Sequence, residues 1–328
     1  MFKSLFTTTI LAAGLGLAGL AQAQTDVTYL LPAPPTLPAF APWVIAKEKG
    51  YYSSKDLNVT FIAAKGGVDV AKQIGAGNAL VGGAIGDTPI VVRANGIPVR
   101  AVAVLGAGGV TMIATNADAH VNSITDLKGK TLTVMSYSDT TYYALLASLR
   151  KAGLGKDDVD VQAAGPAGVW QLFSAKKADA MAGVADWVVD AEDAGVKVKM
   201  IPQDQVFESM AQAILASDDA IKHHPDVVRG VVQATLEGMR DIIQDPHAAA
   251  VTFAKAVPAY AGKEAALERT FKLYVDNVYA HQAVLGQVDP ARLDKVRQFY
   301  VSEGIVAKEP KLEDLYTNQF IDTTTAAK

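Results

Sequence analysis

Short β-rich apolar runs alternate with helical stretches from about residue 26 to residue 210. Parallel strands cannot be joined by a tight turn, so each pair needs a crossover segment, which is usually a helix. The alternation therefore predicts an α/β chain with mostly parallel sheets and helices on both faces. From residue 217 onward the pattern is almost entirely helical, with breaks at prolines.

The pattern divides into two sets of strands. The first set is expected at residues 27–31, 59–63, 80–85 and 99–105, and the second at residues 111–115, 131–135 and 180–184, with one more strand at residues 211–216. Helices are expected at residues 39–49, 68–74, 88–95, 140–151, 165–173 and 187–194. Thr88 followed by Pro89 is typical of an N-cap residue and a first helical position. Two sets indicate two α/β lobes.

We predict that the chain crosses between the lobes twice. Lobe 1 comprises residues 24–108 plus 212–328, and lobe 2 comprises residues 109–211, with the helical tail packed back on lobe 1. Ligands of open parallel sheets bind beyond the carboxyl ends of the strands. Two such edges facing each other make a cleft, and the crossover segments make a hinge.

The first 23 residues predict export. Lys3 gives a positively charged start, residues 10–20 form a short apolar run, and Ala21-Gln22-Ala23 fits a small-x-small cleavage pattern. The run is too short for a bilayer span, which takes about 20 apolar residues. We expect a cleaved signal peptide over residues 1–23 and a mature chain with no direct membrane insertion. An N-terminal anchor that stays attached is the alternative.

The composition narrows the classes of site and partner. The chain has no cysteine, which excludes thiol nucleophiles, disulfides and Cys-based metal sites. Its five histidines are scattered along the sequence, and we expect neither a metal nor a cofactor. The net charge of −4 gives no reason to expect nucleic acid or anionic lipid as a partner. No dinucleotide fingerprint, P-loop or hydrolase elbow is found.

Four motifs carry a family resemblance. They are AKEKGYY at residues 46–52 with DLNV at 56–59, GAGNALVG at 75–82, GDTP at 86–89, and DLKGK at 126–130. In this order and spacing the chain resembles the substrate-binding proteins of ABC importers, in the SsuA/THI5-like branch for alkanesulfonates, taurine, nitrate and thiamine-related pyrimidines. Asn78 stands where that family usually has aspartate.

The resemblance implies a fold and a set of partners. The fold is the two-lobed periplasmic-binding-protein fold, or venus flytrap, with each lobe a mostly parallel sheet flanked by helices. Such a protein closes on a small-molecule ligand in the periplasm and delivers it to a membrane permease driven by a cytoplasmic ATPase. It is not an enzyme. A THI5-like enzyme is a remote alternative, because those enzymes carry a Cys-rich motif that this chain lacks.

Candidate ligand contacts lie in the loops that follow the expected strands. They are Thr36, Phe40, Gly66, Gly67, Asp87, Thr88, Tyr137, Ser138, Asp139, Thr140, Asp186 and Trp187. The glycine pair offers free backbone N–H groups at a helix start, and Trp187 could stack on a planar ligand. Several of these residues have a plainer interpretation. The glycines could form a tight turn, Asp87, Thr88 and Asp139 could be helix caps, and Trp187 could pack its helix against the lobe.

The ligand class stays open between two hypotheses. Helix N-termini and hydroxyls can hold a small organic anion such as a sulfonate, which is the leading hypothesis. Asp87 and Asp139 favour instead a ligand with N–H donors, such as a nitrogen heterocycle, unless both are helix caps. Lys65 is the only basic residue expected at the strand ends.

Overall fold

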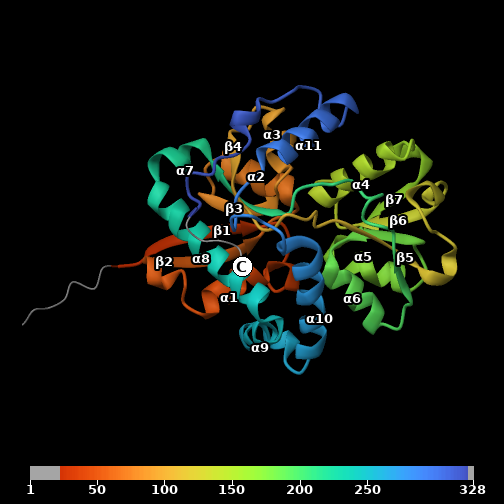
Figure 1. Ribbon diagram of the computed structural model, residues 1–328, viewed down its shortest axis with the longest axis horizontal. Coiled ribbons are helices and arrows are strands. Elements are labelled where there is room, and N and C mark those ends of the chain that lie inside the picture. The colour runs from red at the N-terminus through yellow and green to blue at the C-terminus, as the bar shows by residue number, and fades with distance from the viewer. Residues whose placement is uncertain (1–22, 324–328) are drawn as a thin grey trace, which may run out of the picture.

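The structure is a computed structural model that describes residues 23–323. The predicted signal peptide over residues 1–23 lies outside this range except for its last residue. Two five-stranded sheets, each flanked by helices, stand side by side, and α10 lies between them (Figure 1). Within residues 23–323, no helix is both long enough and apolar enough to cross a membrane.

The first sheet has the strand order β2-β1-β3-β10-β4. Its strands are β1 (Thr25–Leu31), β2 (Leu57–Ala63), β3 (Val81–Ile85), β4 (Val99–Val104) and β10 (Gln212–Ser217). β1 pairs in parallel with β2 and with β3, whereas β10 runs antiparallel between β3 and β4. The sheet is therefore mostly parallel, as predicted, and its one antiparallel strand is the one that returns from the second sheet.

The second sheet repeats this plan in the order β7-β6-β8-β5-β9. Its strands are β5 (Met112–Asn116), β6 (Thr131–Val134), β7 (Asp160–Ala163), β8 (Ala180–Gly183) and β9 (Val198–Met200). β6 is parallel to β7 and β8, and β5 is antiparallel to β8 and β9. In both sheets the strand that follows a crossover is the antiparallel one, and the two-lobed fold class predicted from the sequence is confirmed.

The helices fall into three groups. Those of the first sheet are η1 (Pro38–Phe40), α1 (Ala41–Glu48), η2 (Ser53–Lys55), α2 (Gly67–Gly75) and α3 (Thr88–Arg93). Those of the second are η3 (Ala117–Ala119), η4 (Ile124–Leu127), α4 (Thr140–Lys151), η5 (Lys156–Asp158), α5 (Gly165–Ser174) and α6 (Ala185–Asp193). The C-terminal tail holds α7 (Asp218–His223), α8 (Pro225–Gln244), α9 (Pro246–Ala256), η6 (Pro258–Tyr260), α10 (Glu264–Tyr274), η7 (Val275–Tyr279), α11 (Pro290–Ser302) and η8 (Leu312–Asp314).

The tail covers the first sheet and also reaches the second. α8 and α9 pack on α1, which keeps most of the tail with the first sheet, and α10 packs on both α9 and α6. Prolines begin α8, α9 and α11, and Asp245 and Asp289 cap the last two through their side chains. A proline at the first helical position sacrifices no hydrogen bond, so these breaks divide the tail at little cost.

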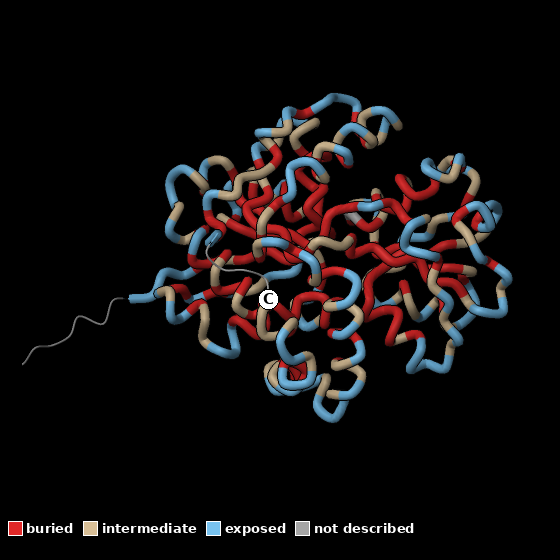
Figure 2. The backbone as a smooth tube through the Cα atoms, viewed as in Figure 1, coloured by how far each residue is buried: buried red, intermediate tan, exposed pale blue. Residues whose placement is uncertain are grey.

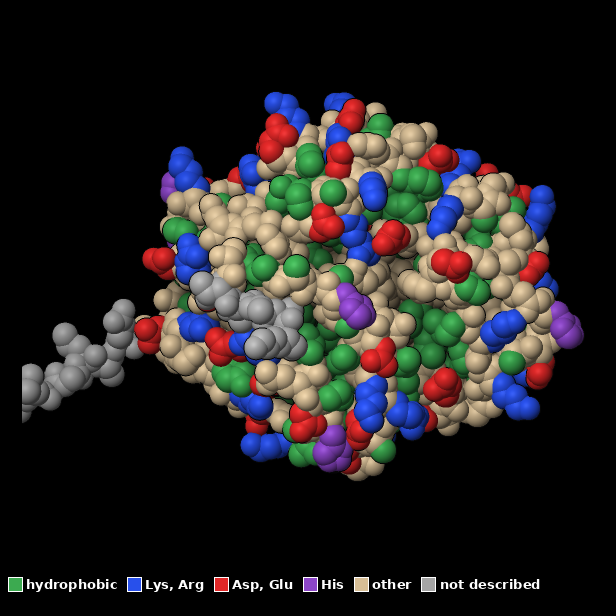
Figure 3. Space-filling model, viewed as in Figure 1, with side chains coloured by type: hydrophobic (Ala, Val, Ile, Leu, Met, Phe, Trp, Pro, Cys, Tyr) green, Lys and Arg blue, Asp and Glu red, His purple; other side chains and the backbone are tan. Residues whose placement is uncertain are grey.

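Burial is concentrated in the sheets and in the helix faces turned toward them (Figure 2). One apolar cluster runs through the first sheet and the tail and continues into the second lobe, where it includes Phe173 and Trp187. A smaller cluster lies on the second sheet and includes Leu132, Leu145 and Leu149. The face in Figure 3 intersperses acidic and basic side chains, as a small negative net charge leads one to expect.

The structure differs from the sequence prediction at two short strands and one cap. β7 and β9 were not predicted, because both are short and largely exposed and lack the apolar alternation that marks a strand. Thr88 is the first residue of α3 and not its N-cap, and its buried Oγ1 has no hydrogen-bond partner among the described residues. The other strands and helices lie within a few residues of their predicted positions.

Candidate functional site

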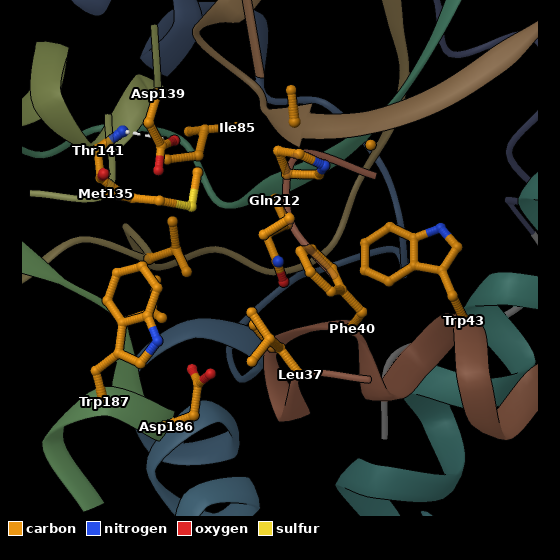
Figure 4. A pocket seen from close by; sticks show the side chains of 17 residues that line it. Leu37, Phe40, Trp43, Ile85, Met135, Asp139, Thr141, Asp186, Trp187 and Gln212 are labelled. Atoms are coloured by element: carbon orange, nitrogen blue, oxygen red, sulfur yellow. Dashed lines mark hydrogen bonds between the residues drawn. The ribbon is translucent and has the colours of Figure 1, made fainter. Parts of the chain in front are cut away.

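A cavity lies between the carboxyl ends of the parallel strands of both sheets (Figure 4). The volume open to the centre of a water-sized sphere is about 50 Å³, so the cavity is narrow in this structure. Its lining residues are Pro32, Ala33, Leu37, Ala39, Phe40, Trp43, Gly83, Ala84, Ile85, Val110, Met135, Asp139, Thr141, Val184, Asp186, Trp187 and Gln212. The position agrees with the general rule for open α/β sheets.

The first-sheet wall is apolar and aromatic. Pro38 starts the single turn η1, which directs Phe40 and then Trp43 of α1 into the region of the cavity. Phe40 meets Trp43 edge-on at 6.1 Å between ring centroids, and Tyr29 lies 6.0 Å from Trp43 on the core side. Ring pairs in this geometry gain stability beyond the burial of their area. Trp43 is thus fixed from behind, and its ring is part of a rigid wall.

α4 supplies the first polar residues of the second-sheet wall. Asp139 is the N-cap of α4, and its carboxylate accepts the backbone N–H of Thr141 at 3.3 Å (dashed in Figure 4). The capping role predicted for Asp139 is therefore confirmed, and the same residue lines the cavity. Asp139 and Thr141 are both buried, and the Thr141 Oγ1 has no hydrogen-bond partner among the described residues.

α6 supplies the other part of this wall. Asp186 and Trp187 occupy its first turn, directly after β8, and are 2% and 3% exposed. A Cβ at Gly183 would lie 2.3 Å from the Trp187 ring, so only glycine at this place allows the ring to lie against β8. In Figure 4, Trp187 and Asp186 lie opposite Leu37, Phe40 and Gln212 across the cavity.

Asp186 has an unusual electrostatic environment. Burial raises the pKa of its carboxyl to about 7, and the hydrogen bond from Tyr274 opposes that rise. The Tyr274 hydroxyl donates to Oδ1 at 2.9 Å from α10, whereas Oδ2 has no hydrogen-bond partner among the described residues. A buried carboxylate without a counter-charge is costly. Oδ2 is therefore ready to receive a donor from a ligand.

Other lining residues also keep unused hydrogen-bonding capacity. Within residues 23–323, the Trp187 Nε1 donor and the Gln212 Oε1 acceptor are buried without a partner, as are Thr141 Oγ1 and Asp186 Oδ2. Buried polar atoms of folded proteins are nearly always paired. With Trp43 Nε1, five lining residues of one cavity hold such an atom, two of them N–H donors and two of them acceptors, and this leaves hydrogen-bonding capacity that a bound molecule could use.

The charges of the lining residues favour a ligand that donates hydrogen bonds over an anionic ligand. The residues that line the cavity in the described part of the chain include two acids and neither lysine nor arginine. Lys65, the basic residue expected at the strand ends, is exposed and is not part of the lining. Residues 23–323 also contain no cluster of His, Asp and Glu that could hold a metal ion.

The two lobes touch where α2 begins. The Ser138 Oγ donates to the Lys65 carbonyl at 2.5 Å, and the Val68 N–H donates to the Ser138 carbonyl at 3.1 Å. Gly66 has a φ of +102°, and a Cβ there would lie 2.9 Å from the Ser138 carbonyl oxygen. The glycine turn therefore serves in this structure as the place where lobe 1 meets lobe 2 directly.

The structure gathers only part of the predicted site. Phe40, Asp139, Asp186 and Trp187 line the cavity. Gly66, Gly67 and Ser138 belong to the contact between the lobes at the start of α2. Thr36 and Tyr137 are exposed outside the lining, and Tyr137 donates its hydroxyl to the Val161 carbonyl at 2.8 Å. The Thr140 side chain lies outside the part that the structure describes.

Asp87 and Thr88 are fully buried away from this cavity. The sequence offered Asp87 as a cap of α3, but its side chain makes no capping hydrogen bond. The carboxylate instead accepts the Met210 N–H at 2.7 Å and the Tyr300 hydroxyl at 2.9 Å. It thereby joins the end of β3 to the returning crossover and to α11. Burial raises the pKa of Asp87 to about 6.

Several lining residues were missed from the sequence. Trp43 lies inside a helix and Gln212 begins a central strand, and the sequence named neither as a ligand contact. Neither had a sequence signal, since their place in the lining depends on the meeting of distant segments. Thr141 had one: it stands two residues after an N-cap that follows a strand.

A family model described as "NMT1/THI5 like" matches residues 37–249. The chain belongs to this family. The match covers the second sheet, the first sheet except β1, and most of the cavity wall, and it confirms the resemblance stated from the motifs.

Two relatives carry further information. The riboflavin-binding protein RibY of Chloroflexus aurantiacus is 25% identical over 289 residues, which cover 86% of this chain and 82% of RibY. The alkanesulfonate-binding protein SsuA of Xanthomonas axonopodis pv. citri, solved with MOPS, has a TM-score of 0.70 at 18% identity and covers 90% of this chain and 99% of SsuA. At this identity the likeness to SsuA shows the fold alone, which is the solute-binding fold of ABC import systems.

The same fold also serves an enzyme. The desulfurization enzyme DSZB has a TM-score of 0.57 at 14% identity, covering 90% of this chain and 97% of DSZB. The structural relatives are mostly substrate-binding proteins, but the fold alone does not separate binding from catalysis.

Proposed function

We propose that this family member is the solute-binding component of an ABC importer and that its ligand is a planar nitrogen heterocycle with N–H donors. The lobes close on the ligand between the Phe40–Trp43 wall and the Trp187 wall. The observation that carries the proposal is the set of unused hydrogen-bonding atoms around a cavity lined by two acids and no basic side chain within the described residues.

The aromatic residues favour a planar ligand. Phe40, Trp43 and Trp187 come from different elements and line one cavity. Flat apolar walls with a few polar groups are the usual arrangement for recognising a ring system with polar edges. Gln212 Oε1 accepts an N–H group, Asp186 Oδ2 accepts one while its carboxyl is ionised and donates when it is protonated, and Trp187 Nε1 donates to a ring carbonyl or nitrogen. The name of RibY supports a heterocycle, because riboflavin is one.

The small organic anion is the second candidate. The N-termini of α4 and α6 both begin at the cavity, and a helix N-terminus attracts negative charge. SsuA, an alkanesulfonate-binding protein, has the same fold. Each of these first turns also has an acid in it or beside it, Asp139 at α4 and Asp186 in α6. An acid that is not protonated would repel a sulfonate.

The partners and the location follow from the proposed class. As an importer component the protein would work in the periplasm, after removal of residues 1–23, and would hand its ligand to a permease coupled to a cytoplasmic ATPase. Lobe limits at residues 24–108 plus 212–328 and at 109–211 are part of the proposal. Catalysis is not proposed, since nothing in the cavity requires it.

Thermal unfolding against a ligand panel tests the proposal. The panel contains riboflavin, a 4-aminopyrimidine, alkyl- and arylsulfonates, nitrate and aromatic carboxylates. A ligand that binds only the folded state stabilises it by about 2.7 kcal/mol at a hundredfold excess over Kd. We expect a rise in Tm with the heterocycles and none with the anions. A rise confined to the anions would reverse the choice, and turnover of a panel compound would support the enzyme alternative.

A further inference from the structure

α6 carries a row of acids toward the C-terminal tail. Asp186, Asp190 and Asp193 are spaced four and three residues apart, so they share one face of the helix. Tyr274 of α10 donates to Asp186 Oδ1 at 2.9 Å, and Arg269 of α10 forms an ion pair with Asp193. Because α10 packs on α9, which in turn packs on α1, both contacts join the second lobe to the first.

We propose that Asp186 and Tyr274 form a proton-linked latch, in which closure of the lobes buries the Asp186 carboxyl against Tyr274 and takes up one proton. Tyr274 acts as a positioning residue: it fixes Oδ1 from the opposite lobe and leaves Oδ2 toward the cavity. The latch rests on the proposed function, because it takes the two lobes to open and close around a ligand.

The burial of Asp186 at the junction gives the latch its direction. When the lobes separate, α6 and α10 part, and the carboxyl regains water and the ordinary aspartate pKa near 3.8. In the closed structure burial raises that pKa to about 7. The closed form therefore binds more protons than the open form between these pH values, and closure is favoured as the pH falls.

Among the described residues, no basic side chain that could replace the proton acts on the Asp186 carboxyl. Around it lie Asp190 on α6, Tyr260 of η6, Tyr279 of η7, and the Ala39 backbone N–H of η1, besides Tyr274 itself. The charged groups farther along this junction are Asp193, Lys263 and Arg269, with Asp139 on the cavity wall. Arg269 is already paired with Asp193. The positive charge of Lys263 acts to lower the pKa of Asp190, against the rise that burial causes.

The absence of cysteine allows a direct measurement of closure. Cysteines introduced by Lys72→Cys on α2 and Asp160→Cys on β7, both exposed sites on opposite lobes, accept a dye pair for energy transfer. In the ligand-free protein we expect the closed-to-open ratio to rise about tenfold from pH 8 to pH 6, the change that one proton gives. Asp186→Asn, which stays neutral, should give a ratio that no longer follows pH.

A pair of tyrosine variants separates positioning from packing. Tyr274 and Tyr279 are both fully buried and stack at 5.5 Å, but only Tyr274 bonds to Asp186. Tyr274→Phe should lower the closed fraction and move the pH midpoint upward, because the ionised carboxylate loses its donor. Tyr279→Phe should keep the wild-type profile. Equal profiles for the two variants would overturn the positioning role.

Two outcomes tell the failure of the latch from the failure of the proposed function. If riboflavin or the 4-aminopyrimidine raises energy transfer while pH has the same effect in wild type and Asp186→Asn, the lobes close but the latch is wrong. If neither pH nor any panel compound changes energy transfer, the lobes do not move, and both the latch and the flytrap function fail.

Discussion

The two walls of the cavity are built from different chemistry. The first-sheet wall presents Phe40, Trp43 and small apolar residues, with Gln212 as its one polar side chain among those described. The second-sheet wall presents Asp139, Thr141, Asp186 and Trp187 at the starts of two helices. The difference teaches that most of the polar groups of the cavity belong to one lobe and most of its apolar surface to the other, so that in the proposed function only closure brings both onto a ligand.

The largest effect should come from keeping the walls apart. Gly66→Ala places a Cβ against the Ser138 carbonyl, and relief of that clash opposes closure. We expect ligand affinity to fall about thirtyfold, equivalent to ~2 kcal/mol of overpacking, when measured by calorimetry with the panel compound that binds best.

Gly77→Ala is the matched control for this change. Gly77 also has a positive φ, of +80°, but nothing lies within 4 Å of the place that a Cβ would take there. Both variants should lose about 1–2 kcal/mol of folding stability from the left-handed conformation. Only Gly66→Ala should lose affinity, and equal affinity losses would mean that the contact at Ser138 does not limit closure.

The next effect compares the two aromatic walls. Trp187→Leu keeps apolar bulk but loses the ring and its N–H, so we expect about a tenfold loss of affinity, or ~1.4 kcal/mol, for heterocyclic ligands. Trp170→Leu on α5 is the control, since Trp170 is half-buried outside the lining. Unchanged affinity in Trp187→Leu would assign stacking to the first-sheet wall, which Trp43→Leu then tests.

A smaller effect should come from Gln212, the polar side chain of the first-sheet wall. Gln212→Leu removes an unpaired buried acceptor without adding a charge. One hydrogen bond contributes about 1 kcal/mol, so ligands with an N–H donor should lose about fivefold in affinity, and aliphatic sulfonates should lose none. A larger loss for sulfonates than for heterocycles would show that Gln212 faces the ligand through its amide N–H₂ group.

The smallest effect on binding should come from Asp87, which lies outside both walls. Its pKa is raised to about 6 in the folded protein by burial, against 3.8 ordinarily. The folded state then holds more protons between these values, so its contribution to stability is present below pH 4 and is lost as pH rises through 6. Between pH 4 and pH 7 the loss of stability in urea unfolding should be smaller in Asp87→Asn than in the wild type by about 1–3 kcal/mol, the share that Asp87 contributes.

The fold was largely predictable because it rests on local patterns. Alternating strands and helices indicated the two sheets, and α4 begins and ends where it was predicted, at Thr140 and Lys151. Asp139, Asp186 and Trp187 line the cavity as expected, because each stands in the segment after a parallel strand, at the edge where open sheets place ligand groups. Such residues need no knowledge of distant contacts.

The differences between the expected site residues and the cavity lining have the opposite cause. Asp87 follows β3 and looked equally suitable, but the Met210 N–H, 123 residues farther along, covers it. Tyr137 follows β6, yet its side chain turns outward to the Val161 carbonyl. Trp43 lines the cavity because η1 turns its helix toward the second sheet. Side-chain direction and long-range cover are properties of the assembled lobes, and no local pattern encodes them.

The position of β10 has a consequence for the order in which the two sheets can fold. β10 fills the place between β3 and β4, although the whole second sheet is synthesised before it. As the chain emerges from its N-terminus, the second sheet can assemble from one continuous segment, whereas the first remains split until residue 217 is available. The first sheet therefore stays incomplete during synthesis. Aggregation or chaperone binding during folding should concentrate on the exposed edges of β3 and β4.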